Sequence, residues 1–224
     1  MSKVQVASVI IAVSIAGDAY ADFAMAMSAV DIAPLRIRSW KSMRDHRIVK
    51  QNLDFSCGSA SLATLLNGFY GESFDEEDFL KAMDNGDKKA SFEDMARVLP
   101  AFGYKAQGFS SGWSQLTQLQ IPVVVYLRYR NSDHFSVIRG IDSSSVWLAD
   151  SSFGNRILSK DEFLEMWLTL GQEGKEPPEG NNRGKILAIL PVGQRPKDSQ
   201  FFSKSPPRRT AISERVLSIR NWAD

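Results

Sequence analysis

The spacing of apolar residues changes once along this chain, near Pro122, and that change limits the fold more than any other feature of the sequence. Before Pro122, apolar residues recur every three or four positions, as they do on one face of a helix. After it, short runs rich in Val, Ile and Tyr alternate with polar turns. Helices that precede strands, instead of alternating with them, predict an α+β fold and not a parallel sheet built from βαβ units.

These patterns predict individual elements. The expected helices include the run Ser59–Phe69, a second after Ser73 and a third from Ser91, the second with a capping box formed by Ser73 and Glu76, and a shorter helix covers 159–167. The expected strands are VVVYLRY, HFSVIRGI, SVWLAD and KILAIL, at 123–129, 134–141, 145–150 and 185–190. Because the first three strands follow one another with short turns between them, we expect an antiparallel meander.

The N-terminal segment has the composition of a secretory signal peptide. Lys3 provides a basic start, an apolar stretch covers Val4–Gly17, and Ala19-Tyr20-Ala21 offers small residues at the positions that signal peptidase reads. The apolar stretch is shorter than the roughly 18 residues that a membrane-spanning helix needs. We expect cleavage before Asp22 and a periplasmic or secreted protein; an uncleaved anchor and a buried N-terminal helix are the alternatives.

Four parts of the chain are expected. They are the signal peptide at 1–21, an N-terminal extension at 22–45, one domain at 46–192, and a linker with a C-terminal amphipathic helix at 193–224. The linker is rich in Pro and Lys and is expected to be loose. The final helix can dock on its own domain or bind a partner.

Composition argues against several classes of function. The 27 Lys and Arg residues balance 26 Asp and Glu residues to a net charge of +1, so no basic surface indicates a nucleic-acid partner. One cysteine cannot form an internal disulfide, and no cluster of Cys and His has the spacing of a zinc site. Glycine-rich loops for phosphates or dinucleotides are absent from the sequence. We therefore expect no metal, no cofactor and no membrane span in the mature chain.

The single cysteine, Cys57, lies where the first helix of the mature chain is expected to begin. A lone cysteine is most often a small buried apolar residue. At a helix start, however, free amide N–H groups and the positive end of the helix dipole favour the thiolate, which is the nucleophilic form. Gly58 leaves room for a substrate beside the thiol. An unpaired thiol is also unusual in an exported protein, which favours a chemical use for it.

A thiol nucleophile needs a base, and the base needs a group that orients it. Of the two histidines, His46 lies in a basic segment that we expect to be extended and exposed. His134 opens one strand and Asp150 ends the next, so an antiparallel connection places them side by side. Gln51, six residues before Cys57, can offer a side-chain N–H that binds an oxyanion together with the Cys57 amide. Each of these residues taken alone has an ordinary structural explanation.

Taken together, the segments QNLDFSCGSASLATLLNGFYG, DHFSVIRGI and LADSSFGNRILSKDEFLEMW resemble the C39 peptidases, papain-like cysteine peptidases best known as bacteriocin-processing domains. The resemblance covers roughly residues 45–170. It implies a papain-like fold in which N-terminal helices pack on an antiparallel sheet. It also implies that Cys57, His134 and Asp150 are catalytic and that Gln51 builds the oxyanion hole.

The chain departs from the family pattern in two respects. It has Ser-Ser after Asp150, where many relatives have a proline. The printed sequence also holds neither the membrane spans nor the ATPase of the transporters to which bacteriocin-processing domains are fused, so the leader-peptide substrate and the cytosolic location of those domains do not transfer.

We therefore expect an exported cysteine peptidase that cleaves a peptide or protein substrate by thiol acyl transfer. Some stand-alone, exported relatives accompany secretion systems, including those for functional amyloid fibres. The resemblance thus implies that the chain processes such a protein or assists its secretion, with a secretion system or an outer-membrane pore as partner. Two alternatives stay open: a peptide-binding module that does not cleave, and a thiol amidase or transferase.

Overall fold

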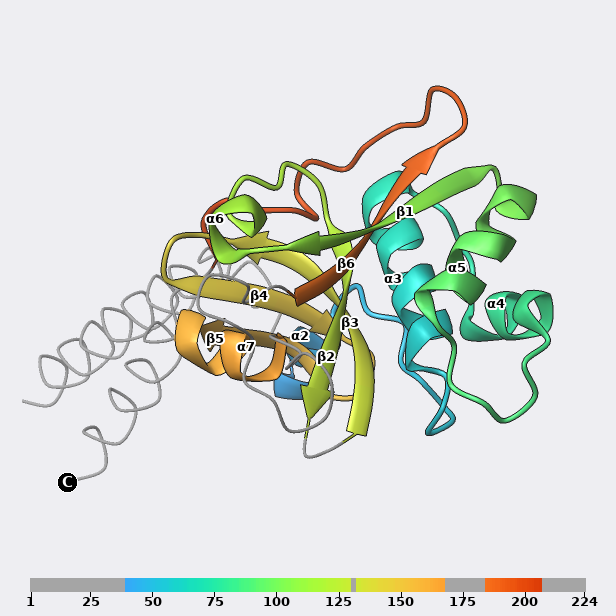
Figure 1. The fold of residues 1–224 in the computed structure, drawn as a ribbon, viewed down its shortest axis with the longest axis horizontal. Coiled ribbons are helices and arrows are strands. Elements are labelled where there is room, and N and C mark those ends of the chain that lie inside the picture. Colours follow the sequence, from blue (N-terminus) through green and yellow to red (C-terminus); the bar gives the residue numbers. More distant parts are fainter. Residues whose placement is uncertain (1–38, 130–131, 168–183, 207–224) are drawn as a thin grey trace, which may run out of the picture. The chain divides into compact units, whose positions relative to one another are not determined.

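The computed structural model describes residues 39–129, 132–167 and 184–206 of the chain. Helices α2 to α5 come first along this part of the chain, and the strands follow with two short helices among them, so the fold is α+β as predicted (Figure 1). The helices are α2 (Trp40–Arg44), α3 (Cys57–Tyr70), α4 (Glu76–Met83), α5 (Phe92–Val98), the 3-10 turn η1 (Leu99–Phe102), α6 (Trp113–Leu116) and α7 (Lys160–Trp167). The strands are β1 (Tyr104–Ser111), β2 (Val123–Tyr129), β3 (Ser132–Ile141), β4 (Ser145–Asp150), β5 (Gly154–Ser159) and β6 (Gly184–Pro191).

The described strands form one sheet in the order β1-β6-β2-β3-β4-β5, with antiparallel pairing throughout. β2, β3 and β4 are the predicted meander, and β5 extends it by one strand. Helices α3, α4 and α5 lie on one side of the sheet, whereas α7 packs on the other side (Figure 1). Each face of the sheet therefore has its own buried apolar core.

Helix α3 is the centre of the first core. Every residue of this helix except Asn67 is buried, which is why its sequence is apolar or small on all sides. The helix ends at Gly71, whose left-handed backbone (φ +76°) lets its N–H bond to the Leu66 carbonyl. Because the whole helix is enclosed by the core, its first residue, Cys57, has a fixed position.

Several local expectations differ from the structure. Residues 40–44, for which no helix is predicted within the N-terminal extension, form α2, which is anchored where Asn155 Nδ2 donates to the Arg44 carbonyl (2.9 Å). The cap of α4 is Asp75 and not Ser73, because Asp75 and Asp78 exchange the two hydrogen bonds of a capping box. The spacing of apolar residues in the sequence also did not predict strands β1 and β5.

The segment after β6 packs on the domain instead of forming the expected loose linker. Phe201 is fully buried, and its ring fills the space where any side chain at Gly68 would lie. Asp198 forms an ion pair with Arg47, and its backbone N–H bonds to helix α3. We call residues 194–203 the C-terminal strap. The expectation of a linker is thus wrong for this segment, because an aromatic side chain in it completes the core.

Other expectations fall outside the described residues. These are the signal peptide at 1–21, most of the extension at 22–45, and the amphipathic helix that closes the chain. Among the residues that the structure describes, no helix is both long and apolar enough to cross a bilayer.

Candidate active site

Cys57 is the first residue of α3, as predicted, and its side chain is 1% exposed. The preceding residue, Ser56, does not cap the helix with its side chain; its hydroxyl donates instead to the Leu53 carbonyl (2.8 Å). The amide groups of the first helical turn therefore keep their hydrogen-bonding capacity for a negative charge. This environment favours a thiolate at Cys57.

His134 lies between the thiol and a carboxylate. Its Nε2 atom is 3.0 Å from Asp150 Oδ2, and its ring also hydrogen-bonds to Cys57. Because Asp150 occupies Nε2, the nitrogen that is left for Cys57 is Nδ1. Strands β3 and β4 bring the histidine and the aspartate together: Val137 pairs with Ala149, so the end of β4 lies beside the start of β3.

These contacts set the protonation states. Burial raises the pKa of the Cys57 thiol, but the hydrogen bond and charge of His134, with smaller contributions from the Phe135 N–H and Lys89, lower it further than burial raises it. Burial lowers the pKa of His134, yet the contacts with Asp150 and Cys57 outweigh burial and raise it to about 9. Both shifts favour the ion pair of a thiolate beside an imidazolium over the neutral pair.

Asp150 is held by the tight loop that follows β4. Its side chain is 1% exposed, and Oδ1 accepts the backbone N–H groups of Ser152 and Phe153, both at 2.9 Å. Burial opposes ionisation of Asp150, but the hydrogen bond and charge of His134, together with these two N–H groups, keep its pKa below the ordinary value. The carboxylate is thus charged and oriented toward the imidazole.

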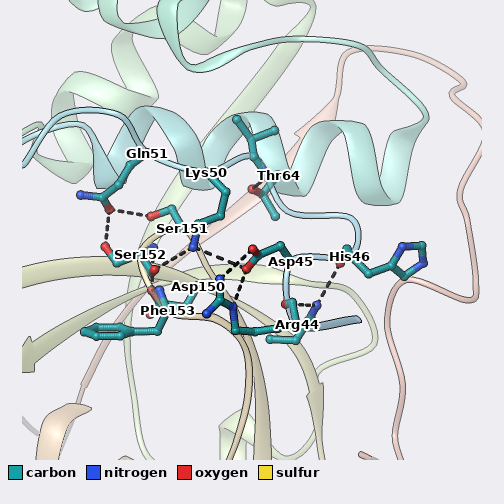
Figure 2. Close-up of polar contacts among 12 residues, drawn as sticks. Arg44, Asp45, His46, Lys50, Gln51, Thr64, Asp150, Ser151, Ser152 and Phe153 are labelled. Atoms are coloured by element: carbon teal, nitrogen blue, oxygen red, sulfur yellow. Dashed lines mark hydrogen bonds and ion pairs between the residues drawn. The ribbon is translucent and has the colours of Figure 1, made fainter. Parts of the chain in front are cut away.

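Gln51 lies against the same loop. Its backbone N–H bonds to the Ser151 carbonyl (3.3 Å), and its side-chain Oε1 accepts the hydroxyls of Ser151 (2.8 Å) and Ser152 (2.7 Å). Its Nε2 donates to the Leu53 carbonyl (3.0 Å). Figure 2 shows the carboxamide with its oxygen directed at the two serines and its nitrogen directed away from them.

The four residues singled out in the sequence therefore belong to one connected network. Cys57, His134 and Asp150 form a chain of side-chain hydrogen bonds, and Gln51 joins the loop that carries Asp150. Their catalytic roles stay predictions. His46 is exposed, as expected, and its backbone carbonyl accepts a hydrogen bond from Asn155 Nδ2.

Sequence reasoning missed the residues that support this network. Ser151 and Ser152 had the composition of an ordinary turn. Glu76 is a buried carboxylate at the start of α4, and both of its oxygens accept hydrogen bonds from Asn52, the neighbour of Gln51. Nothing in the local sequence indicates these pairings, because they join segments far apart in the chain. Within the described ranges, no three His, Cys, Asp or Glu side chains are grouped as a metal site requires.

Comparisons with known proteins agree with this geometry. The sequence model of the peptidase C39 family matches residues 45–171, more than half of the chain. A protein of Pseudomonas fluorescens named "Probable functional amyloid protease FapD" is 37% identical over 153 residues, which are 64% of this chain and 68% of the relative. A protein of Pseudomonas aeruginosa with the same name is 32% identical over 139 residues, 59% of this chain and 62% of the relative.

Solved structures share the fold. The peptidase domain of Streptococcus ComA, a bifunctional ABC transporter of a quorum-sensing pathway, superposes with a TM-score of 0.53 at 15% identity, covering 64% of this chain and 97% of that domain. A double glycine motif protease from an AMS/PCAT transporter, solved with its leader peptide, gives a TM-score of 0.52 at 18% identity, covering 64% of this chain and 90% of that protein.

Proposed function

Because the chain belongs to the peptidase C39 family and is a cysteine peptidase, we propose that it is an exported enzyme that cleaves an amyloid-forming protein. The observation that carries the chemistry is the thiol of Cys57, hydrogen-bonded to an imidazole whose other nitrogen is held by a buried carboxylate. That arrangement supplies a nucleophile, a proton carrier and an orienting group in one line.

The first half-reaction forms a thioester. The Cys57 thiolate attacks the carbonyl carbon of the scissile peptide bond, a C–S bond forms, and the carbonyl oxygen becomes an oxyanion. The Cys57 amide and the Gln51 side chain are the donors that we assign to that oxyanion. His134, as imidazolium, then gives its proton to the leaving nitrogen as the C–N bond breaks.

The second half-reaction releases the acid product. Neutral His134 takes a proton from water, the hydroxide attacks the thioester, and collapse of the tetrahedral intermediate breaks the C–S bond and restores the thiolate. Asp150 keeps Nδ1 of the ring directed at the sulfur through both steps, because it holds Nε2. The cycle ends with the thiolate–imidazolium pair from which it began.

Two observations support export and the substrate class. The first residues have the basic start, the apolar stretch and the small residues of a signal peptide. The Pseudomonas relatives carry the name of a functional amyloid protease at 37% and 32% identity. A partner in the secretion system of such an amyloid protein is a further part of this proposal.

The test compares the purified protein with its Cys57→Ala variant on the amyloid-forming proteins that the source organism exports. New N termini are labelled and identified by mass spectrometry. We expect defined new N termini in an amyloid-forming protein with the wild type and none with the variant.

Two results would argue against the proposal. If the same new N termini arise with Cys57→Ala, a contaminating peptidase made them and this thiol did not. If neither protein cuts and Cys57→Ala still restores fibre secretion in cells that lack the gene, the domain acts there by binding without cleavage.

A further inference from the structure

The Gln51 carboxamide is fixed at both of its ends. Its oxygen accepts two hydroxyls, from Ser151 and Ser152, and its nitrogen donates to the Leu53 carbonyl. Because a backbone carbonyl can only accept, the atom that faces Leu53 must be the NH₂ group, and the oxygen must face the serines. The reversed carboxamide would place two acceptors against each other at Leu53.

This orientation leaves one N–H of Gln51 unused. A carboxamide nitrogen carries two hydrogens, and the Leu53 carbonyl takes one of them. The two serine hydroxyls hold the oxygen, so the remaining N–H has a defined direction. A donor with a fixed direction stabilises an oxyanion without the cost of reorganisation during the reaction.

The serines belong to a loop that is itself anchored. The Ser152 and Phe153 N–H groups bond to Asp150, and the Ser152 carbonyl accepts a hydrogen bond from Lys50 Nζ (2.7 Å). Ser151 is 1% exposed. Figure 2 shows that one short loop therefore contacts both the segment that carries Gln51 and the aspartate that orients the histidine.

Residues close to Gln51 in the chain are also held in place, by hydrogen bonds to helices α3 and α4. Asn52 bonds to Glu76 at the start of α4, and Val49 N–H donates to Thr64 Oγ1 of α3 (3.0 Å). The neighbours of Gln51 in the chain are thus held by helices and its own N–H by the Ser151 carbonyl, whereas the two serine hydroxyls hold its side-chain oxygen in place.

We propose that Ser151 and Ser152 are positioning residues that aim the Gln51 side-chain N–H at the oxyanion of the peptidase reaction. This inference rests on the proposed function, in which Gln51 is an oxyanion donor. Without the two hydroxyls the carboxamide keeps its bond to the Leu53 carbonyl but can turn about it, so the free N–H no longer has a fixed direction when the negative charge forms.

Two thiol reagents separate this role from nucleophile activation, and neither requires knowledge of the natural substrate. Iodoacetamide alkylates the thiolate by displacement at a saturated carbon and creates no oxyanion. p-Nitrophenyl acetate acylates the thiolate through a tetrahedral oxyanion and releases nitrophenolate. The ratio of the acylation rate to the alkylation rate therefore reports the oxyanion donors alone.

We expect Ser151→Ala/Ser152→Ala to lower this ratio on the order of 10-fold to 100-fold, approaching the loss in Gln51→Ala, for which removal of one oxyanion donor predicts roughly 100-fold or more. Adding both alanines to Gln51→Ala should lower the ratio no further, since the serines act through Gln51. Ser152→Thr keeps the hydroxyl and should keep the ratio. Ser110→Ala, at an exposed serine of β1, is the matched control.

The outcomes distinguish the inference from the proposed function. An unchanged ratio in the double alanine variant, with a large loss in Gln51→Ala, overturns the positioning role alone, as does a further loss in the triple variant. An unchanged ratio in Gln51→Ala overturns the oxyanion assignment and the inference with it. Acylation that persists in Cys57→Ala overturns the proposed chemistry. If the double variant misfolds, the single variant Ser152→Ala, at an exposed position, tests the proposal instead. We expect it to lower the ratio of acylation to alkylation, and an unchanged ratio would contradict the proposal.

Discussion

Cys57 is almost completely buried and still favours the charged form, because the unfavourable burial of the thiolate is offset by an imidazolium that is itself stabilised by Asp150. The two charges that these shifts favour balance each other, because the proton that leaves the sulfur is carried by the imidazole nitrogen. At this scale, His134 is the largest of the contributions that lower the pKa of the thiol.

Replacement of His134 by alanine should therefore remove the low-pH reactivity of Cys57. In the wild type we expect iodoacetamide to label the thiol well below its ordinary pKa of about 8.5. In His134→Ala, burial is the largest remaining cause and opposes ionisation, so labelling should require a higher pH. Labelling rates measured from about pH 4 to about pH 9 test this, and identical profiles for the two proteins would contradict it.

The residues of the site differ in how far the sequence could indicate them. Cys57 lies at a recognisable helix start, and His134 and Asp150 lie at the ends of two strands of a recognisable meander, so local patterns could place them together. Ser151 and Ser152 gave no such signal. A serine pair in a turn is common, and its value here comes from contact with Gln51, about a hundred positions earlier in the chain.

At the scale of elements, the strands that the sequence indicated are those with buried alternating or continuous apolar residues. β1 is different, because its residues from Gln107 to Ser110 are exposed and show no alternation. It is a strand because it pairs along its whole length with β6, from Tyr104 opposite Pro191 to Ser111 opposite Gly184. Such pairing is a tertiary effect that local propensity does not contain.

β5 was missed for a related reason. Its burial pattern does not alternate, and it begins at Gly154, directly after the loop that holds Asp150. The residues Ser151, Ser152 and Phe153 form a tight connection that resembles a longer irregular loop in sequence. The strand is therefore defined by its partner β4 and not by its own composition.

The C-terminal strap should contribute measurably to stability through one side chain. Phe201→Ala removes a fully buried ring that packs against Gly68 of α3 and under Arg139, whose guanidinium lies 4.6 Å from the ring centre. We expect a loss of about 3–5 kcal/mol in the free energy of unfolding, measured with urea.

A surface substitution close to the strap provides the comparison. Val192 is 67% exposed, so Val192→Ala should change the free energy of unfolding by no more than about 0.5 kcal/mol. Equal effects of the two substitutions would mean that the strap does not form part of the core.

At the scale of the whole molecule, the pair of Cys57 and His134 contributes to the dependence of stability on pH with two opposite slopes. A histidine whose pKa rises from about 6.5 in the unfolded chain to about 9 in the fold contributes stability below pH 6.5 and loses it as pH rises toward 9. A thiol whose pKa is lowered contributes stability above its unfolded pKa of about 8.5 and loses it as pH falls. Between about pH 6.5 and 8.5 the two slopes have opposite signs.

Because the two slopes oppose each other, the contribution of the pair to the free energy of unfolding should change little with pH in this window. In that window the raised pKa of His134 makes stability fall as pH rises, whereas the lowered pKa of Cys57 makes stability rise, so the two contributions oppose each other. We expect the difference in unfolding free energy between the wild type and Cys57→Ala/His134→Ala to stay constant from about pH 6.5 to about pH 8.5. A slope of one proton in this difference would show that only one of the two groups has a shifted pKa.

The strap also has a consequence for the order in which the molecule is assembled. Ribosomes make the chain from its N terminus, so the thiol and the imidazole are synthesised well before Phe201. Until the strap has been made, the space beside Gly68 of α3 is not filled by Phe201, and Arg47 lacks its ion-pair partner Asp198. A nascent chain that lacks the strap thus carries Cys57, His134 and Asp150 without the ring that completes the core, so the folded enzyme can form only after the strap has been translated.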